Sequence, residues 1–333
     1  MKGKSLILLF VISLFFSCKQ SNSSKNQNDF SSLFQVVKEI EAELSLLTSE
    51  IVLLKNYNES LIANRKRILK NAKLDPYEFD GGFSTNIPGG DINLSSIVIM
   101  EKTPSFAEAL EEVKLTNSLD SVFKVIKSKY SFVAQVYSNS SMQVSRVFPA
   151  YDAKDLITTD VDLIKYNFYY KADEENNPLK GPVWIPDAYV DPAGRGWILS
   201  LIHPIYDKEE LFSVVGIDIT VDEIIAKYLS PEDGNLIIVT KNGDIVAASA
   251  SAIEVLSFPP LKNYIYKDII LEDNFRISDY NLFNSKNEEV RVMADEFLRK
   301  EKSIFEFSEE YSPKSARMVH FDVIDWVLIE VNL

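Results

Sequence analysis

The most regular pattern of apolar positions lies near the N-terminus of the chain. Between residues 33 and 68, apolar side chains recur at alternating steps of four and three, and Asn58 is the one polar interruption. This spacing predicts a long helix with one apolar face, which Pro76 is expected to end. Two partners for that face remain open: a second copy in a coiled coil, or the helix's own domain, against which it would form a spine. The apolar stripe consists of Leu33, Val37, Ile40, Leu44, Leu47, Ile51, Leu54, Leu61 and Ile68.

The middle of the chain passes from turn signals to helical and then to strand-like patterns. Residues 77–103 hold two glycine pairs and two flanking prolines, which predicts a loop-rich link, and a helix is expected at about 105–128. The apolar period then falls to two, so YSFVAQVYS and MQVSRVFPAY predict paired strands. Residues 150–180 are irregular and rich in tyrosine. The elements expected after them are strands at 182–185, 196–205 and 211–219 and a helix at 221–228.

A second unit begins near residue 230. The stretch NLIIVTKNGDIVAASA predicts a hairpin that turns at Asn242-Gly243, and a helix over 287–300 and closing strands follow it. About 300 folded residues exceed what one core usually supports. We therefore expect an α+β protein with a spine helix in residues 30–76, followed by two PAS-like subdomains with antiparallel sheets, at 77–229 and 230–333.

The first 18 residues resemble an export signal. Two lysines precede the apolar run from Leu6 to Phe16, which is too short to cross a bilayer, and Ser17-Cys18 closes it. Leu14 lies four residues before Cys18, and the small residue Ser17 lies directly before it, which resembles a bacterial lipobox. We expect residues 1–17 to be a lipoprotein signal peptide, Cys18 to carry the lipid, and residues 18–29 to be a flexible tether.

Composition and motifs narrow the possible functions. The chain has a net charge of −14, so it lacks the basic footprint that nucleic acid needs. It contains no GxSxG, HExxH, Walker or GxGxxG pattern. Its two histidines, His203 and His320, are expected to be ordinary strand residues. We therefore expect no catalytic residues, no metal site and no cofactor.

Several stretches in order resemble a double Cache (dCache) extracellular sensing domain, the ligand-binding module of many bacterial chemoreceptors and sensor kinases. After the long helix come YSFVAQVY and VSRVFPAY, then NFYYKA, VWIPDAYVDPAGRGWILSLIHPIYD and SVVGIDITVDEI. In the second unit, NLIIVTKNGDIVAAS and the strand around Trp326 continue the resemblance. The resemblance implies an α/β subdomain, distant from the membrane, whose pocket binds a small ligand.

The resemblance also implies which positions line that pocket. In members that bind amines and amino acids, an Arg-x-Trp-Tyr block, a later Tyr and a later Asp contact the ligand. Tyr189 and Asp218 match the later Tyr and Asp. The aromatic pair matches Tyr169-Tyr170 or, one residue earlier, Phe168-Tyr169, and in these two registers Asn167 or Tyr166 replaces the arginine. Loss of that arginine removes bidentate recognition of a carboxylate, which argues against an ordinary α-amino acid as ligand.

Asp218 is also notable on physical grounds alone. It interrupts the apolar run VVGIDI, where a lone buried carboxylate would be costly. A bound ammonium would satisfy it, with aromatic faces adding cation–π attraction. The alternatives are that Asp218 caps a loop or the following helix, and that the aromatic residues, including Trp184 and Trp197, are core. The candidate ligand-binding residues are Tyr169, Tyr170, Trp184, Asp187, Tyr189 and Asp218.

These observations predict a lipid-anchored sensory module on the periplasmic side or the cell surface. It would bind a small, amine-like or polar molecule, would have no output domain of its own, and would pass a signal to another membrane protein by contact. The alternative is a surface lipoprotein that binds a macromolecule and whose pocket is filled.

Overall fold

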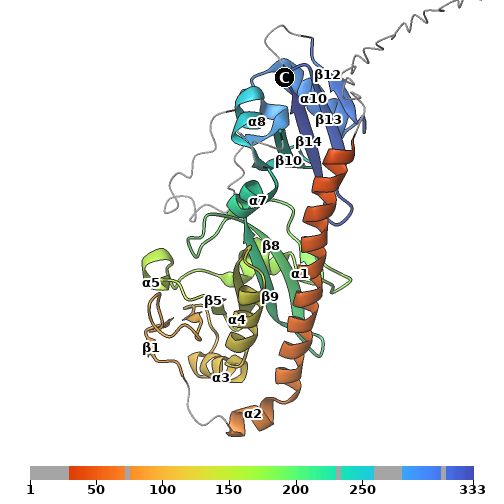
Figure 1. The fold of residues 1–333 in the computed structure, drawn as a ribbon. Helices are drawn as coiled ribbons and strands as arrows, with labels where there is room; N and C mark the ends of the chain where they lie inside the picture. The colour runs from red at the N-terminus through yellow and green to blue at the C-terminus, as the bar shows by residue number, and fades with distance from the viewer. Residues whose placement is uncertain (1–29, 72–75, 230–233, 259–279, 309–312) are drawn as a thin grey trace, which may run out of the picture.

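One long helix runs beside two antiparallel sheets in the computed structural model (Figure 1). The structure describes residues 30–71, 76–229, 234–258, 280–308 and 313–333. The predicted α+β class, with a long N-terminal helix followed by antiparallel sheets, is confirmed. The predicted signal peptide, Cys18 and the tether lie outside the described residues. Among the described helices, none is long and apolar enough to cross a membrane.

Helix α1 (Ser31–Ala63) buries the predicted apolar stripe. The side chains from Leu33 to Leu54 on that face are at most 4% exposed, and they pack chiefly on strands β8 and β9. The helix is therefore a spine on its own chain. It ends before the predicted stop at Pro76, because the backbone breaks at Asn64, and α2 (Arg65–Asn71) continues as a separate short helix.

The larger sheet has nine strands within the described residues, in the order β1-β2-β3-β5-β4-β9-β8-β6, with β7 also paired to β8. The central strands β4, β9 and β8 are antiparallel neighbours. The region 77–103, predicted to be a link, contributes three strands, including the fully buried β3. The strands are β1 (Phe79–Asp80), β2 (Phe83–Ser84), β3 (Ser96–Ile99), β4 (Val133–Ser140), β5 (Val144–Phe148), β6 (Val183–Trp184), β7 (Tyr189–Val190), β8 (Trp197–Asp207) and β9 (Glu210–Thr220).

Helices cover both faces of the larger sheet. On one face, α1 packs together with α4 (Leu119–Lys129), and α3 (Phe106–Thr116) covers β3 and β5. The expected helix at 105–128 is thus two helices, which break at Asn117 and Ser118. The other face is covered by α5 (Ala153–Leu156), the 3-10 turn η1 (Leu163–Lys165) and α6 (Asn167–Tyr170). These short elements leave room over the sheet for the cavity described below.

The smaller sheet has five described strands in the order β11-β10-β14-β13-β12. Helix α7 (Val221–Tyr228) leads into it, and the predicted hairpin turns at Asn242-Gly243, where Gly243 has a φ of 86°. His203 and His320 lie in strands β8 and β13, as predicted. The remaining elements are β10 (Asn235–Thr240), β11 (Ile245–Ala248), α8 (Ala250–Val255), the 3-10 turn η4 (Leu282–Asn284), α10 (Glu288–Leu298), β12 (Ile304–Glu306), β13 (Ser315–His320) and β14 (Trp326–Asn332).

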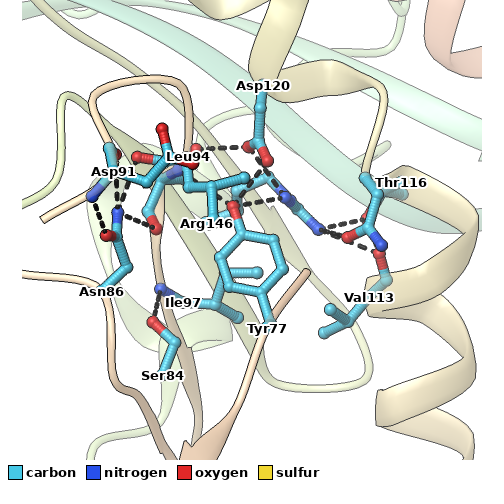
Figure 2. Close-up of polar contacts among 12 residues, drawn as sticks. Tyr77, Ser84, Asn86, Asp91, Leu94, Ile97, Val113, Thr116, Asp120 and Arg146 are labelled. Atoms are coloured by element: carbon cyan, nitrogen blue, oxygen red, sulfur yellow. Dashed lines mark hydrogen bonds and ion pairs between the residues drawn. The ribbon is translucent and has the colours of Figure 1, made fainter. Parts of the chain in front are cut away.

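A buried ion pair fixes strand β5 of the larger sheet to helix α4 (Figure 2). The guanidinium of Arg146 on β5 lies 2.8 Å from the carboxylate of Asp120 on α4, and both side chains are almost completely buried. Asp120 also accepts hydrogen bonds from the hydroxyls of Tyr77 and Ser95. Because the Asp120 carboxylate has three donors, its burial cost is offset locally.

The two sheets share one apolar core along α1. Side chains of β8, β9, β10, β13 and β14 all belong to the cluster that contains the helix stripe. Trp326 at the start of β14 is fully buried, and its indole N–H donates to the Pro186 carbonyl at 2.8 Å. This bond joins the smaller sheet to the segment that leads into β7.

Candidate functional site

A cavity of about 230 Å³ lies over the face of the larger sheet that is turned away from α1. Alternate residues of the central strands form its floor, and the segments 151–168 and 189–193 form its walls. Its polar and aromatic lining residues are Gln135, Tyr137, Asn139, Ser145, Tyr151, Asp155, Thr158, Tyr166, Phe168, Tyr189, Asp191 and Asp218. Its aliphatic lining comes from Met100, Val147, Leu156, Ile157, Val161, Leu163, Pro192, Ala193 and Ile198.

Asp218 lies on the cavity floor and is 1% exposed. Its neighbours across the sheet are Ser200 on β8 and Gln135 on β4, which the strand register places beside it. Ser200 Oγ donates to one carboxylate oxygen at 2.5 Å, and Gln135 Nε2 donates to the other at 2.7 Å. Burial, with the nearby Asp191 carboxylate, raises the pKa of Asp218 to about 8 despite these bonds.

Asp191 is a second buried carboxylate at the cavity. Gln135 Nε2 donates to it at 3.1 Å, so a single amide group bridges the two acids. The backbone N–H groups of Ala193 and Arg195 also donate to Asp191. This tight loop needs positive φ at Gly194, 81° here, which glycine adopts without strain. Burial raises the pKa of Asp191 as well.

Tyr189 connects the cavity wall to Asp218. Its hydroxyl lies 2.5 Å from Ser200 Oγ. When Ser200 donates its own proton to an ionised Asp218, Tyr189 must be the donor to Ser200. The three groups then form one chain of hydrogen bonds that ends on the carboxylate. Burial is the main cause that raises the pKa of Tyr189 well above its usual value, so it remains a neutral donor.

Aromatic rings form one side of the cavity. Tyr166 and Phe168 are stacked, with centroids 5.2 Å apart, and Phe168 meets Tyr137 edge to face at 6.2 Å. Tyr166 occupies the cavity at one of the two positions where the resemblance places the missing arginine. Among the described residues that line the cavity there is no lysine, arginine or histidine.

The predicted site residues fall into two groups. Tyr189 and Asp218 lie together at the cavity. Tyr169 is buried beside it without lining it, and Tyr170 is 36% exposed. Trp184 lies on the opposite face of the sheet, where its indole N–H donates to Thr48 of α1 at 3.3 Å, and Trp197 packs against the same core. Asp187 is exposed in the connection between β6 and β7.

Sequence reasoning did not single out Gln135, Tyr137, Asp191 or Ser200. One signal for Asp191 was present, since it lies two positions after Tyr189 in the stretch AYVD. Gln135, Tyr137 and Ser200 enter the site only through strand pairing. Within the described residues, no group of three or more acidic, histidine or cysteine side chains could hold a metal ion.

Comparison with known proteins gave structural similarities alone. No family model matches the chain, and no curated protein matches it. The sensory domain of the Campylobacter jejuni chemoreceptor Tlp3 (CcmL) with isoleucine bound is 13% identical, with a TM-score of 0.40 over 91% of this chain and 94% of that one. The ligand-binding domain of the Pseudomonas aeruginosa chemoreceptor PctC in complex with GABA is 14% identical, with a TM-score of 0.41 over 86% and 98%. The extracellular domain of the putative histidine kinase soHK1S-Z6 is 11% identical, with a TM-score of 0.42 over 90% and 96%.

Proposed function

We propose that the protein is a sensory domain that binds a small amine lacking a carboxylate. One observation carries this proposal: the cavity has the buried acids Asp191 and Asp218 on its lining and no basic side chain among the described lining residues. A ligand carboxylate would find no cation there, whereas an ammonium group would find carboxylate acceptors.

The aromatic wall suits the same ligand. Tyr137, Tyr166 and Phe168 present ring faces and edges to the cavity. A cation near such rings gains attraction that grows when water is excluded. The open space beside Asp218 and Tyr189 favours this function over that of an interaction protein with a filled pocket.

Placement at the membrane is part of the proposal. Lipid on Cys18 would hold the domain outside the cytoplasm, and the segment 18–29 would act as a tether. The bound state would then be read by a membrane protein that contacts the domain. Metabolic labelling with an alkyne fatty acid tests the anchor: the wild-type chain should be labelled, and Cys18→Ser should not.

Ligand binding is tested by thermal denaturation of the full chain with matched compounds. Butylamine and 4-aminobutyrate have the same carbon chain but differ in the carboxylate. Butylamine should raise the melting temperature, since a ligand at one hundred times its Kd stabilises by about 2.7 kcal/mol. The acid should have a much smaller effect, and Asp218→Asn should abolish the response to butylamine.

Two outcomes contradict this function. In the first, 4-aminobutyrate stabilises the protein as well as butylamine does. In the second, no amine changes the melting temperature, while a sugar, purine or carboxylate does.

A further inference from the structure

The basic side chain of Arg195 belongs to the hydrogen-bond network of the cavity but lies outside the cavity lining. Its Nε donates to Gln135 Oε1 at 2.7 Å, and one terminal nitrogen donates to the Pro149 carbonyl at 2.8 Å. Both acceptors are neutral. Gln135 in turn donates through Nε2 to Asp191 and Asp218. Gln135 thus separates the guanidinium from both acids, and the guanidinium does not line the cavity.

This arrangement sets the charge of the site. Two buried carboxylates and one guanidinium give a net charge of −1 when both acids are ionised. The positive charge of Arg195 lowers the pKa of both carboxyls and so opposes the effect of burial. Because Gln135 lies between Arg195 and the two carboxylates, the guanidinium acts on both acids electrostatically and forms a direct ion pair with neither.

We propose that Arg195 is a specificity-determining residue that limits the ligand to one positive charge. The inference rests on the proposed amine-binding function. When both acids are ionised, a monocation makes the buried site neutral. A short dication would leave one excess positive charge near the guanidinium, in a place where uncompensated charge is costly. Asp155 also lines the cavity but is exposed, so water screens its attraction for a second ammonium.

Two ligands of nearly equal size isolate this effect. In 3-aminopropanol a hydroxyl stands where 1,3-diaminopropane carries its second ammonium, and both compounds are protonated on nitrogen at neutral pH. Calorimetric titration of the full chain gives Kd for each. The wild-type protein should prefer the aminoalcohol by about tenfold or more, from the repulsion of one extra charge at partial screening.

Variants at position 195 separate charge from geometry. Arg195→Lys keeps the charge and should keep the preference, even though it loses the two-nitrogen contact. Arg195→Gln removes the charge and should reduce the preference by about tenfold. Lys154→Gln is the matched control, because that lysine pairs with Asp80 on the surface and is not part of the network. Its preference should equal that of the wild type.

The possible results are distinct. If the wild-type protein binds neither compound, the proposed function fails and this inference fails with it. If the wild-type protein binds both equally, or if Arg195→Lys and Arg195→Gln change the preference alike, amine binding stands and the role of Arg195 in charge selection is overturned. The wild-type comparison decides even if Arg195→Gln does not fold.

Discussion

The ring of Tyr137 occupies the space in which a side chain on Gly216 would lie. A Cβ built on Gly216 would come within 2.0 Å of Tyr137 Cζ. The two residues are paired across strands β4 and β9, so the absence of a side chain on one strand admits the aromatic ring of the other. The ring of Tyr137 therefore lies over Gly216, and both Tyr137 and Asp218 line the cavity.

Gly216→Ala should destabilise the protein by about 1–3 kcal/mol, because the added methyl group forces the ring out of its place. The displaced ring would enter the cavity, so amine binding should weaken too. Urea denaturation measures the first effect and calorimetry the second. Gly181→Ala is the control, since a Cβ there meets nothing within 4 Å. Equal stability of the two variants would contradict the proposed packing.

Asn58 is fully buried in the apolar face of α1, and neither polar atom of its side chain has a hydrogen-bond partner in the described part of the chain. Asn58→Leu should therefore stabilise the protein by about 1–3 kcal/mol, because it removes two unsatisfied groups. Asn56→Leu on the exposed side of the same helix should change stability by less than about 0.5 kcal/mol. A loss of stability in Asn58→Leu would show that the amide has a partner, such as a bound water.

Removing one member of the buried pair Arg146–Asp120 should be severe. Arg146→Met leaves the Asp120 carboxylate without its cation and should cost about 3–5 kcal/mol in urea denaturation. The double variant Arg146→Met with Asp120→Leu should recover about half of that loss. For comparison, Lys241→Met breaks the exposed pair with Asp325 and should have little effect. If Arg146→Met and Lys241→Met are equally stable, the buried pair does not stabilise the fold.

The stability of the ligand-free protein should depend on the protonation of Asp218. Its pKa rises from 3.8 to about 8 on folding, so the folded state binds more protons than the unfolded state between these values. The free energy of unfolding then falls as pH rises through this window. Glu112, whose pKa burial raises to about 7, adds to the same trend.

Asp218→Asn should flatten this dependence by at most about 1.4 kcal/mol per pH unit, the contribution of one proton. Denaturation series at several pH values would measure it, and the partly exposed Asp152→Asn serves as control. Parallel curves for wild type and Asp218→Asn would mean that Asp218 is ionised in the empty site.

Periodicity predicted the elements whose apolar pattern is contained in one continuous stretch of sequence. The stripe on α1 and the hairpin at Asn242-Gly243 follow from local spacing. Strand β3 was missed because its four buried residues stand among glycine-rich turns, where a short apolar run carries no period. The break at Asn117 also escaped notice, since the helical pattern continues on both sides of it.

The site was only partly predictable for a related reason. Asp218 is conspicuous because it is an acid in an apolar strand, but Gln135 is conspicuous nowhere in the sequence. It reaches Asp218 through the pairing of β4 with β9, although the two residues lie 83 positions apart along the chain. Trp184, by contrast, was predicted to line the pocket but does not. Strand alternation decides which sheet face a residue occupies, and Trp184 faces Thr48 on α1.

Because the spine helix packs on both sheets, neither sheet can be removed without exposing part of the core. The N-terminal half of α1 lies beside β13 and β14, and the same helix continues along the larger sheet (Figure 1). A fragment that stops at Leu229 would keep the helix but remove the smaller sheet from its N-terminal half. A fragment that starts at Gly234 would lack the Pro186 carbonyl, to which the buried indole of Trp326 donates. Protein for binding studies should therefore retain both sheets, and a reporter is better fused at the C-terminus than inserted between them.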